Sequence, residues 1–111
     1  MPYGSVEDLP TWEGMKVGRA DWEAGHDRGP FLEGLPDDMC QCPHWGYVIS
    51  GTLEVRYTDG SEEHIDAGQA FYLPPGHAAR TTEGATFIVV SPEKEAHVTQ
   101  AHVKSKREAA Q

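Results

Sequence analysis

The chain has 111 residues, of which 38% are hydrophobic and 24% are charged, and it contains 12 glycines and 8 prolines. This length fits one domain with one core, and the composition is typical of a turn-rich globular protein rather than a helical bundle or a disordered chain. The formal net charge of −9 argues against nucleic acid as a partner, because phosphate binding requires a basic surface.

The sequence also argues against a membrane protein. No stretch approaches the ~20 apolar residues that a membrane span needs, and the N-terminal residues do not combine a basic segment with an apolar run. We therefore expect a soluble, cytoplasmic protein without a membrane partner.

The N-terminal third contains few regular patterns. Residues 1–14 show no sustained period and predict an arm that lies on a surface of this chain or of a partner. Residues 15–23 alternate well enough to predict a strand. Residues 25–36 contain three glycines and two prolines, which indicate a loop without a helix.

A series of short β-rich runs separated by turn residues forms the clearest pattern in the chain. Gly51 separates the first two runs, and Asp59-Gly60 suits a tight turn with positive φ. Such a series, with no convincing helix inside it, predicts an all-β sandwich or barrel with a core at about residues 15–91. The predicted strands are residues 44–50, 52–58, 62–66, 69–73, 77–82 and 85–91.

The composition changes at residues 92–111, which we expect to form a C-terminal tail. This segment is rich in Ala, Lys and Glu, with sparse aliphatic residues at Val98 and Val103. Burial of so few apolar residues offsets little of the entropy cost of ordering the segment. The pattern therefore predicts a short, marginal helix or a frayed tail.

Four potential metal ligands lie on alternate residues: Asp38, Cys40, Cys42 and His44. Alternate side chains of an extended strand share one face, so all four would point into the same space. The two cysteines cannot form an ordinary disulfide, since a loop that short strains the bridge. Downstream, a rigid Pro-Pro-Gly turn delivers a further imidazole, that of His77. Together these residues outline a metal site.

The glycine, proline and strand pattern of residues 34–91 resembles the cupin superfamily. Gly51 ends the first cupin motif, and Gly68, Pro74 and Gly76 reproduce the spacing of the second. The resemblance implies one cupin domain over residues 1–111, a double-stranded β-helix or jelly-roll barrel with an N-terminal arm and a C-terminal helix or tail.

The ligand positions depart from the usual cupin pattern. His44 stands at the position of the family's glutamate, Cys40 at that of its second histidine, and Asp38 at that of its first. In the second motif the usual histidine is Ala79, and His77 lies two residues earlier, on the same face of a strand. The resemblance therefore implies a fold more directly than a reaction.

We interpret His44, His77 and one or both of Cys40 and Cys42 as the metal ligands. Mixed nitrogen and sulfur donors suit Zn²⁺ first, with Fe²⁺, Ni²⁺ or copper as alternatives. Four such ligands would close a structural tetrahedron, whereas three would leave one position open for water or a substrate. In the alternative interpretation the thiols fill the core and the histidines are hydrogen-bonded, which leaves a metal-free pocket. Asp38 is equally well explained by a solvated turn.

The expected ligand is a small molecule, and three functions stay open. The first is an enzyme whose reaction could be that of an isomerase, lyase or dioxygenase, since cupins host all three. The second is a module that senses a metal or a ligand without turnover. The third is a metal-free cupin that binds or acts on a small organic ligand. Tyr72 and Arg80 are candidates for ligand contacts at the barrel mouth, with simple surface positions as the alternative.

The side of the predicted strand opposite His44 carries Trp45, Tyr47 and Ile49. An apolar outer face of a small jelly roll often packs on a second copy, so we predict a homodimer, with packing under the N-terminal arm as the alternative. The other four histidines are interpreted as solvated surface residues. They are His26, His64, His97 and His102.

Overall fold

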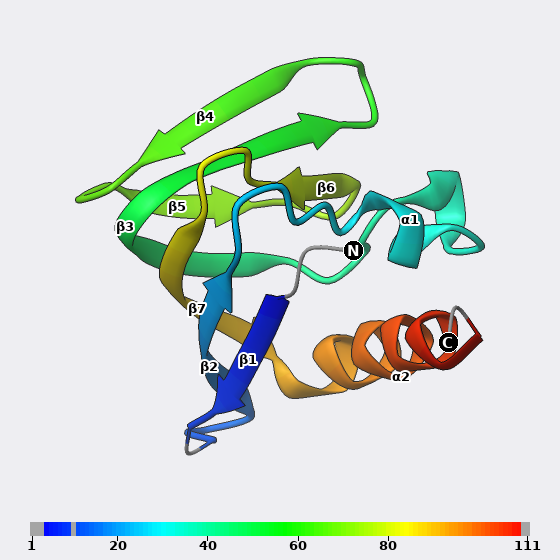
Figure 1. Cartoon of the computed structure of the whole chain (residues 1–111). Coiled ribbons are helices and arrows are strands. Elements are labelled where there is room, and N and C mark those ends of the chain that lie inside the picture. The colour runs from blue at the N-terminus through cyan, green and yellow to red at the C-terminus, as the bar shows by residue number, and fades with distance from the viewer. Residues whose placement is uncertain (1–3, 10, 110–111) are drawn as a thin grey trace.

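The structure is a computed structural model that describes residues 4–9 and 11–109. Seven strands, paired antiparallel, form the main part of the fold of the described chain, as the sequence predicts (Figure 1). The strands are β1 Gly4–Asp8, β2 Met15–Trp22, β3 His44–Tyr57, β4 Glu62–Asp66, β5 Ala70–Leu73, β6 His77–Arg80 and β7 Ala85–Pro92, and the helices are α1 Gly29–Leu32 and α2 Glu93–Ala109.

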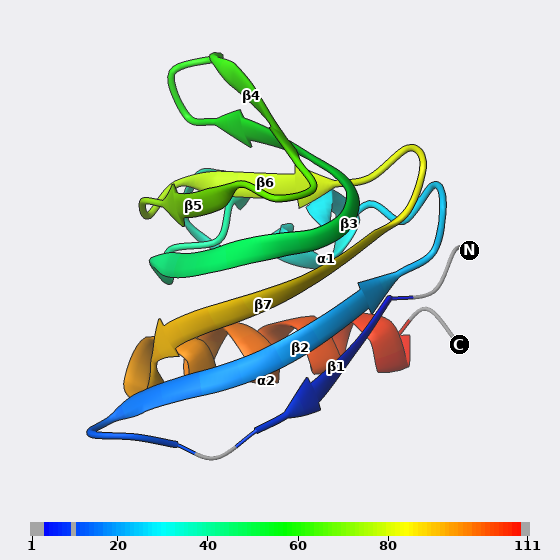
Figure 2. The same cartoon turned by 90° about the vertical axis from the view of Figure 1, so that its left-hand side faces the viewer.

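The 14-residue strand β3 joins the two halves of the barrel (Figure 2). Its first half pairs with β5 and β7, and its second half pairs with β4 and β6. The register with β7 shifts between Val48 and Ser50, just before Gly51, whose φ of 77° bends the strand. The predicted strands 44–50 and 52–58 are therefore one bent strand, and the prediction of an all-β jelly roll is confirmed.

The barrel encloses an apolar core because alternate residues of its strands point inward. On β3, the side chains of Val48, Leu53 and Val55 are almost completely buried. A second apolar cluster lies between α1, α2 and the loop that precedes β3, and it includes both cysteines. The segment predicted to hold metal ligands thus lies where the helices meet the barrel.

Two predictions for the N-terminal region were wrong. Within residues 1–14, β1 pairs antiparallel with β2 at an edge of the sheet, so this part is a strand and not a surface arm; residues 1–3 and 10 lie outside the described residues. The loop at residues 25–36 contains the short helix α1, which begins with Gly29-Pro30. Proline is compatible with the first helical turn, and burial of Phe31 and Leu32 stabilises it.

The C-terminal segment is a 17-residue helix, α2, which runs alongside β2 and β7 (Figure 2). Its buried side chains are Ala96 and Val103, so few apolar residues suffice to dock it. Glu93 and Glu95 lie in its first turn and Lys106 and Arg107 in its last, an arrangement that complements the helix dipole. Of the two predicted forms of the tail, the helix is confirmed for the described residues.

Among the residues that the structure describes, no helix combines the length and apolar character needed to cross a membrane.

Candidate metal centre

Three of the predicted ligands converge: Cys40, His44 and His77. One ligand atom from each lies within 4.8 Å of the other two. The Cys40 Sγ atom is 3.5 Å from the His44 Nε2 atom, and the two imidazole rings meet edge to face with centroids 5.0 Å apart. Cys40 and His77 are buried, whereas His44 is partly exposed.

Backbone hydrogen bonds bring these residues together from three parts of the chain. The Cys40 N–H donates to the His77 carbonyl oxygen (2.8 Å), and the Gly76 N–H donates to the Cys40 carbonyl oxygen (2.8 Å). Gly76 has a φ of 90°, which ends the Pro-Pro-Gly turn and starts β6 at His77. His44 is the first residue of β3. The site therefore lies at strand ends on a scaffold of paired backbone.

The prediction that the four residues from Asp38 to His44 share one face of a strand was wrong. No strand covers residues 39–43, and Asp38 ends a 3-10 turn (Pro36–Asp38) with a φ of 56°. The Asp38 side chain is exposed, and its Oδ1 atom accepts a hydrogen bond from the Gly34 N–H (2.9 Å). Positive φ at two successive residues turns the chain and breaks the period of two. Asp38 is a turn residue.

The structure does not bring Cys42 into this group of three. Its Sγ atom is buried and lies 3.4 Å from the Pro43 carbonyl oxygen. Burial, and to a lesser degree the nearby Cys40, raise the pKa of its thiol to about 12, although a hydrogen bond with Ser91 has the opposite effect. The Cys42 thiol thus stays protonated at neutral pH.

The far nitrogen of each imidazole has a partner that orients the ring. The His77 Nδ1 atom lies 2.7 Å from the Pro74 carbonyl oxygen, and the His44 Nδ1 atom lies 2.5 Å from the Ser91 Oγ atom. A carbonyl oxygen only accepts, so His77 carries its proton on Nδ1 and keeps a lone pair on Nε2. Metal-binding histidines usually have such outer partners.

The protonation states also suit metal binding. Burial lowers the pKa of His44, and the neighbouring His77 and Arg28 lower it further. Burial lowers the pKa of His77 as well, although its hydrogen bond to Pro74 has the opposite effect. Both rings are therefore neutral donors at pH 7. Burial raises the pKa of the Cys40 thiol, so a metal would displace its proton on binding.

The separation of one donor pair fits a tetrahedral ion. A sulfur at about 2.3 Å and a nitrogen at about 2.0 Å from one zinc ion, at the tetrahedral angle, lie about 3.5 Å apart. The observed separation of Cys40 Sγ and His44 Nε2 is 3.5 Å. The Cys40 and His44 donors thus have the chemistry and the spacing of two zinc ligands, and the His77 donor lies within 4.8 Å of both.

The three ligands line a cavity of about 360 Å³ inside the barrel. Its walls are mostly apolar and come from the strands and from α2, which closes one side. Neither Tyr72 nor Arg80 lines it. Tyr72 stacks on Trp45 outside the barrel (ring centroids 5.2 Å apart), and Arg80 pairs with Glu54 (3.1 Å). Both occupy surface positions, which was the alternative interpretation of these residues.

Several polar residues of the cavity were missed from the sequence, among them Arg28, Ser91, Thr99 and Arg107. Ser91 follows the inward alternation of Phe87 and Val89 on β7, so the period of two could have identified it. The other three lie in a loop or on α2. Their proximity to the site depends on how the helix docks, for which the local sequence carries no signal.

The interpretation of the other histidines was wrong for His26, which is 1% exposed and packs against Trp22 with ring centroids 4.7 Å apart. His64 and His97 are exposed, as predicted. His102 is partly buried, and its Nε2 atom lies 2.8 Å from the Glu33 carbonyl oxygen.

Comparisons with known proteins support the fold. No family model matches the sequence, and no curated protein matches it. An RmlC-like cupin from Shewanella frigidimarina is 20% identical, with 80% of this chain and 76% of that chain covered and a TM-score of 0.58. A putative ethanolamine utilization protein q from Salmonella typhimurium is 21% identical. The match covers 81% of this chain and 70% of that chain, with a TM-score of 0.63. Ectoine synthase from P. lautus is 16% identical, with 85% and 70% covered and a TM-score of 0.62.

Proposed function

Because this chain has the cupin fold, we propose that it binds one divalent transition metal through Cys40, His44 and His77 and presents that metal to a small molecule in the cavity. The observation that carries the proposal is the convergence of three donors, two neutral imidazoles and one thiol, on one point of the cavity wall. Three protein ligands leave a coordination position open for the small molecule.

Zinc is the proposed metal, with Fe²⁺, Ni²⁺ and copper as alternatives. One thiolate and two imidazoles are soft to borderline donors, which suit these ions better than Mg²⁺ or Ca²⁺. When bound, such a metal acts as a Lewis acid on an oxygen atom of its ligand. Around it, Ser91 and the Pro74 carbonyl orient the imidazoles, and the apolar walls exclude water from the ligand.

Metal loading tests this proposal directly. Chelator-treated protein titrated with Zn²⁺ is expected to bind about one equivalent, and its melting temperature is expected to rise, since a ligand at 100 times its Kd stabilises the folded state by about 2.7 kcal/mol. Elemental analysis and thermal unfolding measure the two effects. Binding of less than about one-tenth of an equivalent of Zn²⁺, with an unchanged melting temperature, would contradict metal binding and favour the metal-free pocket.

We place the protein in the cytoplasm as part of the same proposal. Cys40 and Cys42 are free thiols, which a reducing compartment preserves.

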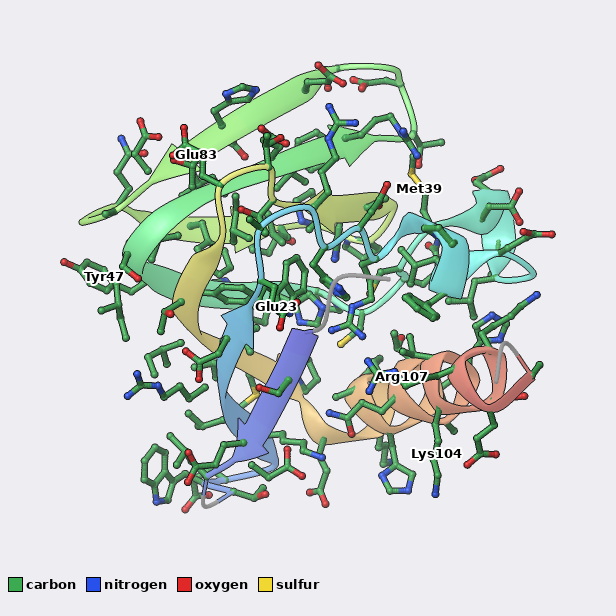
Figure 3. The ribbon with its side chains drawn as sticks, in the orientation of Figure 1. Glu23, Met39, Tyr47, Glu83, Lys104 and Arg107 are labelled. Carbon is green, nitrogen blue, oxygen red and sulfur yellow. The ribbon has the colours of Figure 1, made fainter. Side chains whose placement is uncertain are left out.

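We also propose that the protein is a homodimer formed through the outer apolar face of the barrel. Four of the seven large hydrophobic side chains that are exposed in the described chain share this face: Trp45, Tyr47, Ile49 and Tyr72. Figure 3 shows Tyr47 projecting outward from β3. A contiguous apolar face of this kind favours association with a second copy.

Charge substitution on that face tests the dimer. Tyr47→Glu is expected to shift the protein from dimer to monomer, because burying a carboxylate in an apolar interface is costly. Size-exclusion chromatography with light scattering measures the mass. The matched control is Val98→Glu, which places the same charge on an exposed hydrophobic position of α2 and is expected to leave the dimer intact. A monomeric wild-type protein at micromolar concentration contradicts the prediction.

A further inference from the structure

Positive side chains are concentrated around the cavity of an otherwise acidic protein. The chain contains 9 lysines and arginines and 18 acidic residues, for a formal net charge of −9. Four of those nine basic residues line the cavity, but only one of the 18 acidic residues, Asp8, does. The basic residues are Lys16, Arg28, Lys104 and Arg107. The interior therefore has the opposite charge to the molecule as a whole.

Three of these basic residues have no carboxylate partner among the described residues: Arg28, Lys104 and Arg107. Lys104 is exposed, whereas Arg28 and Arg107 are partly buried. Lys16, in contrast, pairs with Asp8 at 3.4 Å. The Arg28 guanidinium lies over the Trp22 ring, with its Cζ atom 5.1 Å from the ring centroid, and the Arg107 Cζ atom lies 5.7 Å from the centroid of Phe31. Stacking on aromatic rings holds each guanidinium in place but does not neutralise it.

Arg28 interacts electrostatically with Arg107 and with two residues of the metal centre, Cys40 and His44. Burial, and to a lesser degree the charge of Arg107, lower the pKa of Arg28 to about 10, whereas Cys40 has the opposite effect. In Figure 3, Arg107 lies at the edge of α2 nearer the barrel. A divalent metal on the Cys40 thiolate would carry a net charge of about +1, and the two arginines would raise the local charge to about +3. Such an excess of positive charge favours an anionic ligand.

The rest of the cavity is apolar. Trp22, Leu53, Phe71 and Phe87 contribute to its walls. The volume of about 360 Å³ is within the range of pockets that bind small organic molecules. A bare inorganic anion would leave these walls without a partner.

We propose that the cavity binds a small organic acid, with its carboxylate held by Arg28 and Arg107 beside the metal centre and its apolar part packed against the barrel walls. A guanidinium group matches a planar carboxylate with two parallel hydrogen bonds. This inference rests on the proposed function, since it names the class of ligand for the same cavity.

The test is calorimetric titration of zinc-loaded protein with benzoate and with its neutral analogue benzamide. Benzoate is expected to bind at least about tenfold more tightly than benzamide. Arg28→Gln and Arg107→Gln are each expected to weaken benzoate binding by about tenfold or more. The affinity for benzamide is expected to stay the same. The matched control is Arg56→Gln, which removes one positive charge from an exposed position of β3. It is expected to leave the affinities for benzoate and benzamide unchanged.

Equal affinity for benzoate and benzamide would overturn the inference, as would unchanged benzoate binding in both arginine variants. Tighter binding of phenyl phosphate than of benzoate would also overturn it in favour of a phosphate ligand. Zinc content and thermal unfolding are measured for each variant. Absence of zinc from the wild-type protein counts against the proposed function, whereas retained zinc without a preference for carboxylate counts against this inference alone. If Arg28→Gln does not fold, the benzoate affinity of Arg107→Gln alone tests the inference.

Discussion

Replacement of Cys40 by serine is expected to weaken zinc binding by at least about 100-fold. The change exchanges a soft, charged thiolate for a hydroxyl that stays neutral, and it leaves two imidazoles as the only protein ligands. Loss of an outer-shell partner alone costs about 10–100-fold in metal affinity, so loss of a direct ligand is expected to cost more. Competition with a chromophoric chelator measures the affinity.

Cys42→Ser is the matched control, because it makes the same chemical change at a buried cysteine two residues away. We expect its zinc affinity to stay within a few-fold of the wild-type value, since its Sγ atom is outside the group of three ligands. Equal losses in both variants would mean that Cys42 is a fourth ligand and that the site is closed. Retention of zinc by Cys40→Ser would show that the ligands are misassigned.

Gly51→Ala is expected to lower the free energy of unfolding by at least about 3 kcal/mol. Gly51 has a φ of 77°, a conformation that costs an L-residue about 1–2 kcal/mol. A Cβ atom there would also collide with the carbonyl oxygen of Gly84, so β3 would have to move away from the turn before β7. Overpacking of this kind typically adds about 1–3 kcal/mol. The hydrogen bond from Thr52 N–H to the same oxygen (3.3 Å) would be lost.

Gly60→Ala separates the two contributions to this effect. Gly60 has a similar φ of 87°, but a Cβ atom added there would have no neighbour within 4 Å, so only the backbone penalty of about 1 kcal/mol is expected. Urea unfolding of both variants, with the slopes compared, measures the difference. Equal losses would mean that the close approach of Gly51 and Gly84 contributes nothing to stability.

Much of the fold follows from local sequence. Strand alternation, the Asp59-Gly60 turn and the Pro-Pro-Gly turn depend on neighbouring residues, so they can be read directly from the chain. Other elements depend on distant contacts. β1 forms because β2 offers it an edge, and α2 is ordered because Ala96 and Val103 dock on the barrel and α1. Helix propensity within α2 carries little of that information.

The candidate site divides in the same way. The resemblance to cupins places Cys40, His44 and His77 in the two segments that correspond to the cupin motifs, and the glycines and prolines that mark those segments can be read from the local sequence. Only the tertiary structure decided which cysteine faces the histidines. The loop at residues 39–43 is not a strand, so its side-chain directions are set by backbone pairing with His77, 37 residues away in the sequence. The same holds for Arg28 and Arg107, which meet at the cavity only because α2 packs across it.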